Sequence, residues 1–139
     1  MTKYLKLLIL ALTLVSSANT WAVCTNEDLT GFWDYFESGS DYKLDCSLRL
    51  DGKKITMHRF GCDSYGNNGG ETGNDNVTGT LSVDQYCHVS GTIFFTGNSG
   101  RKYETKILKA TLNQSRQTIH ATALIDQVEY ASFTMVKFY

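Results

Sequence analysis

The amino-acid sequence predicts an all-β protein: an antiparallel up-and-down meander of about eight strands that closes into a barrel. Three observations support this prediction. The 139 residues include 12 Gly, 8 Tyr and 7 Phe but no Pro, a composition typical of strands joined by glycine turns. Residues 42–50 alternate between apolar and polar side chains almost without fault. Most predicted connections have the length of a hairpin loop, which favours strands that are neighbours in the sheet.

The N-terminal segment has the pattern of an export signal. Lys3 and Lys6 give it a positive start, and an apolar core follows at 7–15. This core is too short to span a bilayer, so we expect no stable membrane insertion after signal cleavage; an anchor is the less favoured alternative. Small residues precede the predicted cut after Ala22. The expected organisation is a signal peptide followed by a single β-barrel domain in an exported, periplasmic or secreted protein: 1–22 and 23–139.

The opening strand carries Trp33, the only Trp beyond the predicted signal. Further strands are expected where aromatic, β-branched or alternating residues lie between turn residues. The predicted strands are 28–36, 42–50, 53–60, 77–83, 87–95, 102–113, 118–125 and 128–138.

The second strand gives the strongest periodic signal. Leu44, Cys46 and Leu48 share one face, and the residues between them are polar, which indicates one buried and one solvated face. Asp51-Gly52 follows and predicts a type I′ hairpin turn, because both residues tolerate positive φ.

The return strand places Met57 and Arg59 at the inward parity of Ile55. After it, residues 61–76 hold almost no apolar side chain and are predicted to form a long irregular loop. Part of this loop, 69–76, is similar to a glycine-aspartate calcium turn, but its spacing has an extra residue. We interpret it as a solvated loop at a barrel mouth.

A meander of this length can curl and close, which removes its exposed edges. The interior of an eight-stranded barrel is either just filled by side chains or forms a cup for one small ligand. A two-sheet sandwich is the alternative, although it normally needs longer crossing connections than those in this sequence.

Four cysteines in an exported chain of this size predict two disulfides, with three possible connectivities. They lack the close pairs that a metal site requires. In a meander, Cys24 and Cys87 lie at one end, whereas Cys62 lies at the other, nearer the inward-facing Cys46. We therefore favour the pairs Cys46–Cys62 and Cys24–Cys87.

The segment Leu29-Thr30-Gly31-Phe32-Trp33 resembles the first strand of calycins, the superfamily that includes lipocalins, avidins and fatty-acid-binding proteins. The closing Phe133-Thr134-Met135-Val136-Lys137 is similar to a calycin last strand, and the small exported metalloprotease inhibitors of bacteria are similar too. The resemblance implies a calycin-like barrel in which a basic residue, here Lys137, packs across Trp33. No further Trp follows, so no biotin site is implied.

Other chemistry has little support in the sequence. Charge is near balance, formally −1, without a basic run, which argues against nucleic-acid binding. His58, His88 and His120 lie on different predicted strands and are interpreted as independent surface residues rather than a zinc site. No nucleophile stands near a base at a known catalytic spacing, so we expect no enzyme, no cofactor and no metal.

The predicted function is an exported, non-enzymatic, lipocalin/avidin-like binding protein. Trp33 is expected mainly as a core plug, with any function at the far end of the barrel, near the loop after Cys62. A small apolar or amphipathic ligand would lie in the barrel. The alternative is a protein-binding module, such as a periplasmic protease inhibitor or an envelope or host interaction protein, that acts through its loops. The candidate ligand-binding residues are Trp33, Tyr35, Leu44, Leu48, Met57, Arg59 and Leu81.

Overall fold

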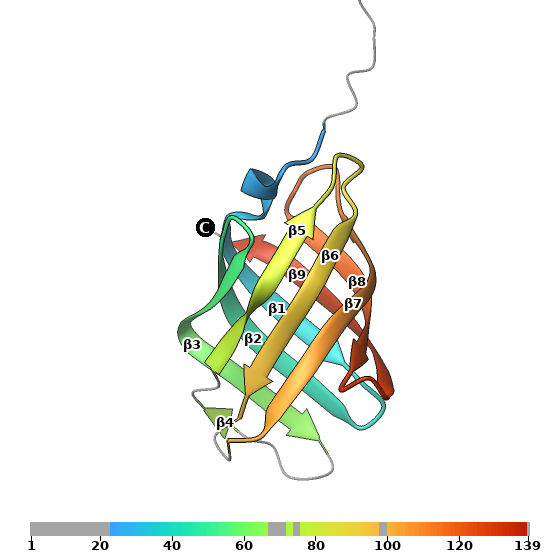
Figure 1. The fold of residues 1–139 in the computed structure, drawn as a ribbon. Coiled ribbons are helices and arrows are strands. Elements are labelled where there is room, and N and C mark those ends of the chain that lie inside the picture. The colour runs from blue at the N-terminus through green and yellow to red at the C-terminus, as the bar shows by residue number, and fades with distance from the viewer. Residues whose placement is uncertain (1–22, 67–71, 74–75, 98–99, 139) are drawn as a thin grey trace, which may run out of the picture.

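The computed structural model describes residues 23–66, 72–73, 76–97 and 100–138, with the backbone alone for 57–61, 64–66 and 72–73. A short 3₁₀ helix, η1 (Asn26–Leu29), precedes the strands (Figure 1). The strands are β1 (Gly31–Ser38), β2 (Tyr42–Asp51), β3 (Lys54–Gly66), β4 (Thr72–Gly73), β5 (Asn76–Val83), β6 (Val89–Thr96), β7 (Lys102–Leu112), β8 (Thr118–Ile125) and β9 (Glu129–Phe138). The predicted signal peptide lies outside the described residues.

The strands form a closed antiparallel barrel. Each strand from β5 to β9 pairs with the next one along the chain, β9 pairs with β1, and β1 continues through β2 and β3 to β5. The two-residue β4 pairs only with β3 and stands beside this ring of eight strands. The predicted meander and barrel are therefore confirmed. No helix of the described part is long and apolar enough to cross a membrane.

Two ends of the barrel are distinct (Figure 1). One, the η1 end, has η1 beside the start of β1. The other, the distal end, has the β1–β2, β6–β7 and β8–β9 connections. β1 begins at the η1 end, so Trp33, its third residue, lies near that end. The last residue of β1, Ser38, lies at the distal end.

The interior follows from the alternation of side chains. In β2, Leu44, Cys46, Leu48 and Leu50 are buried and the residues between them are more exposed, as the periodicity predicts. The same alternation recurs in β1 and in β5 to β9, and the buried side chains of the described residues form one continuous apolar core. Each fully buried large apolar side chain contributes about 1.5–3 kcal/mol to this core.

The opening strand begins later than predicted. Residues 26–29 form η1 instead, because Asp28 Oδ2 accepts a hydrogen bond of 2.7 Å from the backbone N–H of Thr25. The N–H of Thr30 then donates to the carbonyl oxygen of Glu27 at 3.0 Å and ends the helical turn. The prediction of strand at 28–30 was wrong because these local hydrogen bonds satisfy backbone groups before β1 begins.

The predicted loop at 61–76 is also partly wrong. β3 continues to Gly66 because β2 supplies backbone partners on both sides of an irregularity, from Asp51↔Lys54 to Leu48↔Met57 and from Cys46↔Cys62 to Tyr42↔Gly66. The pairing register shifts between Leu48↔Met57 and Cys46↔Cys62. Counting alternate residues from Ile55 therefore does not tell which side chains beyond this irregularity face inward. Cross-strand pairing thus overrides a polar sequence with weak strand preference. The calcium-like turn falls mostly outside the described residues.

The β2–β3 turn differs by one residue from the prediction. Asp51 pairs with Lys54, so Gly52 and Lys53 form the turn, and of these two only Gly52 has positive φ, +56°. Glycine in the first position with positive φ is typical of a type II′ turn. A turn with positive φ at both residues is found instead at Asp126 and Gln127, between β8 and β9.

Both predicted disulfides are confirmed. Cys46 and Cys62 are direct cross-strand neighbours on β2 and β3, with Cα atoms 4.1 Å apart. Cys24 and Cys87 join the segment before η1 to the β5–β6 connection, with Cα atoms 5.1 Å apart. No described cysteine is free.

Candidate functional site

Trp33 fills the interior next to the η1 end. Its side chain is fully buried, and its Nε1–H donates a 2.7 Å hydrogen bond to the carbonyl oxygen of Leu29 in η1. Leu29 is itself fully buried and belongs to the same core. The indole therefore ties η1 to the core at this end, as expected of a plug.

Lys137 on β9 is the cross-strand partner of Trp33. Its Nζ lies 5.4 Å from the centre of the Trp33 ring system and donates to the carbonyl oxygen of Asp28 at 3.0 Å. Burial lowers the pKa of Lys137, whereas Asp28 raises it. The predicted packing of Lys137 across Trp33 is confirmed.

Gly31 explains why the motif on β1 needs glycine. Its φ is +141°, and a Cβ atom built on it would lie 2.6 Å from Cε of Lys137. Any side chain here would displace the lysine from the indole. The spacing Gly-x-Trp thus leaves room for the basic side chain that covers the tryptophan.

A buried carboxylate lies in the interior toward the distal end. Glu37 on β1 is 3 % exposed, and it accepts hydrogen bonds from three hydroxyl groups. The hydroxyl of Tyr35 donates to Oε2, and that of Tyr42 donates to Oε1 at 2.5 Å. Thr105, from β7 across the barrel, donates to Oε2 at 3.2 Å. We call these four residues the Glu37 cluster.

The electrostatics of the Glu37 cluster are dominated by burial. Burial raises the pKa of Glu37, the three hydroxyl donors lower it, and the nearby Glu129 raises it further. The pKa values of Tyr35 and Tyr42 are raised, first by burial and then by the charge of Glu37. Both phenols therefore remain protonated donors at neutral pH.

Aromatic rings pack against the Tyr35 side of the Glu37 cluster. The Tyr35 ring lies 5.0 Å from that of Phe133 and 5.5 Å from that of Phe95, measured between ring centres. Both Phe side chains belong to the buried core. The interior thus presents a carboxylate, hydroxyl groups and aromatic surface within one small region.

Five of the sequence-predicted ligand residues, Trp33, Tyr35, Leu44, Leu48 and Leu81, lie in the buried core. The side chains of the other two, Met57 and Arg59, lie outside the described residues, so their placement stays a prediction. Sequence reasoning missed Glu37 and Thr105. The parity of Glu37 with Trp33 and Tyr35 is a signal that could have found it.

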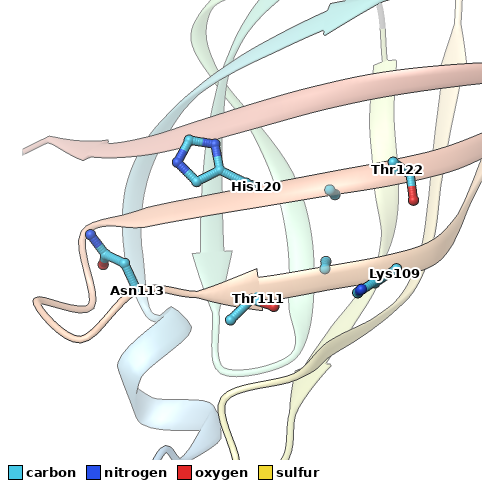
Figure 2. A pocket seen from close by; sticks show the side chains of 7 residues that line it. Lys109, Thr111, Asn113, His120 and Thr122 are labelled. Atoms are coloured by element: carbon cyan, nitrogen blue, oxygen red, sulfur yellow. The ribbon is translucent and has the colours of Figure 1, made fainter.

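The outer surface carries a separate feature. A shallow depression of about 330 Å³ lies over β7 and β8. Figure 2 shows its polar side chains, including His120 and Asn113. His120 and His88 are both exposed, as predicted, whereas the side chain of His58 is not described. The described residues contain no group of three side chains placed to hold a metal.

Comparisons with known proteins support the barrel. No family model and no curated protein sequence matches the chain. A solved structure of a redesigned β-barrel, mFAP1, bound to DFHBI is similar, with a TM-score of 0.56, 9 % identity, and coverage of 81 % of this chain and 98 % of that one. The barrel mFAP0, also bound to DFHBI, has a TM-score of 0.53, 10 % identity, and coverage of 79 % and 99 %. At such identity the likeness shows the fold alone.

Proposed function

We propose that this chain is an exported, non-enzymatic binding protein of calycin type, which holds a small apolar or amphipathic molecule in its barrel. One observation supports this most directly: among the described residues, the apolar interior contains a buried carboxyl group that is hydrogen-bonded to hydroxyls. Ligand sites typically combine apolar walls with a few placed polar groups that orient the ligand. In this arrangement Leu48 and Leu81 contact the apolar body, and the Glu37 cluster binds the polar end.

Further observations support parts of this proposal. The arrangement of Gly31, Trp33 and Lys137 is the one that the resemblance to calycins implies. The two disulfides suit an oxidising compartment, consistent with export. The similar barrels mFAP1 and mFAP0 are described as bound to a small molecule, so a closed barrel of this general shape can take such a ligand.

The second candidate function is protein binding through the connections between strands. Val128 and Tyr130, at and beside the β8–β9 connection, are 81 % and 75 % exposed. Large apolar side chains at such a position favour a protein contact. In this alternative the barrel interior serves only stability.

Native mass spectrometry tests the proposed function. We expect protein purified from its own host to carry an extra mass of a small organic molecule. Unfolding the same sample in denaturant and refolding it should restore the bare chain mass, which serves as the control. A barrel that is consistently empty when purified would contradict ligand storage and favour the loop-mediated alternative.

A further inference from the structure

We propose that the Glu37 cluster recognises a positively charged amine, so that the ligand of this barrel is a small amphipathic ammonium compound. This inference rests on the proposed function, because it names the chemical class of the molecule held inside. It goes further in assigning the recognition to one carboxylate. It also predicts that neutral and anionic molecules of the same size are disfavoured.

Glu37 is a buried carboxyl group that has no ion-pair partner among the described side chains. Glu37 is 3 % exposed, yet the ion pairs of the described residues join Asp84 to His88 and Asp28 to Arg116. The hydrogen bonds that the described residues make to Glu37 come from neutral hydroxyls. Hydroxyl donors offset only part of the cost of removing a carboxylate from water, and an ammonium group would offset more.

The carboxyl group of Glu37 has one acceptor position that the described residues leave unused. A carboxylate offers about four lone-pair sites, two on each oxygen. Among the described residues, Oε2 accepts from both Tyr35 and Thr105, whereas Oε1 accepts from Tyr42 alone. Oε1 therefore keeps one lone pair that these residues do not use. An ammonium N–H is the donor that such a charged oxygen binds most strongly.

Two acidic side chains, Glu129 and Asp126, act electrostatically on the Glu37 cluster. Glu129 raises the pKa of both Glu37 and Tyr42, and Asp126 raises that of Tyr42, so the field of these acids extends to the cluster. Glu129 is held at this place by Ser40, whose N–H and hydroxyl both donate to Oε1 at 2.7 Å. These two acidic groups favour a cation over an anion at the cluster.

Aromatic rings lie beside the carboxyl group of Glu37. The ring of Tyr35 lies against those of Phe95 and Phe133. Aromatic faces attract cations and also accommodate an apolar ligand body. A carboxylate next to aromatic rings therefore fits an amine on an apolar skeleton better than an acid or a sugar.

The experiment compares three molecules that share a six-carbon chain: hexylammonium, hexanol and hexanoate. Protein that has been unfolded and refolded to remove cargo is titrated with each by isothermal calorimetry at neutral pH. We expect hexylammonium to bind about tenfold more tightly than hexanol, because hydrogen bonds to charged groups are the stronger ones. Hexanoate should bind most weakly.

Variants assign the preference to Glu37. Glu37→Gln should lose the amine preference while hexanol binding changes little. Asp45→Asn removes the same charge from an exposed position on β2 and should leave the preference intact. Tyr42→Phe removes the hydroxyl that donates to Oε1 and should increase the preference for hexylammonium over hexanol, because the carboxylate then has one donor fewer. If Glu37→Gln fails to fold, an unchanged preference in Tyr42→Phe would still overturn the inference.

The outcomes separate the two proposals. Equal binding of hexylammonium and hexanol, or an amine preference that survives in Glu37→Gln, would overturn the inference and leave the proposed function standing. Binding of none of the three molecules would overturn the inference and count against a small-molecule site in the barrel as well.

Discussion

Replacing Lys137 by Met tests whether the contact between the last strand and Trp33 stabilises the barrel. Met keeps much of the length of the side chain beside Gly31 but removes the charge and the N–H donors. The substitution therefore deletes the hydrogen bond from Nζ to the carbonyl oxygen of Asp28 and the contact of Nζ with the Trp33 ring. The apolar packing of the stem is retained.

The expected loss follows from these two contacts. A hydrogen bond that involves a charged group contributes about 1.5–3 kcal/mol, and a partly exposed cation–π contact contributes about 0.5–1 kcal/mol. Met also avoids the cost of partly burying an ammonium group, which is visible in the lowered pKa of Lys137. We therefore expect Lys137→Met to reduce the free energy of unfolding by about 1–3 kcal/mol.

Urea unfolding followed by fluorescence measures this loss, because Trp33 is the only tryptophan among the described residues. The matched control is Lys106→Met on β7, where the lysine is exposed. We expect the control to change stability by no more than about 0.5 kcal/mol. If the two variants are equally stable, Lys137 contributes no more than an ordinary surface lysine and the reasoning is refuted.

Two further predictions concern the cross-links and the buried carboxylate. The disulfide Cys24–Cys87 spans 63 residues and Cys46–Cys62 spans 16, so replacing each pair by Ala should cost about 4.3 and about 3.1 kcal/mol in the chain-entropy account. Urea unfolding should show this order, and a reversed order would contradict the account. Burial raises the pKa of Glu37, so its contribution to stability is present below the unfolded pKa of about 4.3 and is lost as pH rises through the folded pKa. The free energy of unfolding of Glu37→Gln, relative to that of wild type, should therefore increase as pH is raised from acid to neutral. Parallel plots of this free energy against pH for the two proteins would contradict the prediction, because Glu37 would then have the same pKa in the folded and unfolded states.

Much of the architecture could be predicted because it depends on local patterns. Side-chain alternation in 42–50 determines which face of β2 is buried, and short connections make successive strands antiparallel neighbours. The order of strand ends was enough to match Cys46 with Cys62 and Cys24 with Cys87. In each case the information lies within one strand or in the direction of the strands.

The wrong strand predictions concern segments whose backbone conformation depends on a distant partner strand or on a local hydrogen bond. The polar segment after Phe60 forms strand because β2 offers it backbone partners, which sequence composition does not reveal. Residues 28 and 29 are helical because Asp28 satisfies the N–H of Thr25. Local preference was too weak to decide either segment against these interactions.

The sequence alone predicted the order of the eight main strands, the buried face of β2 and the favoured cysteine pairs, since these follow from periodicity and chain direction. Only the tertiary structure decided that Glu37 meets hydroxyls from three places in the chain, one of them Thr105 on the far side of the barrel. Closing the barrel brought these groups together, and burial then set the electrostatics of the carboxylate. Both effects depend on distances between strands, which no single stretch of sequence contains.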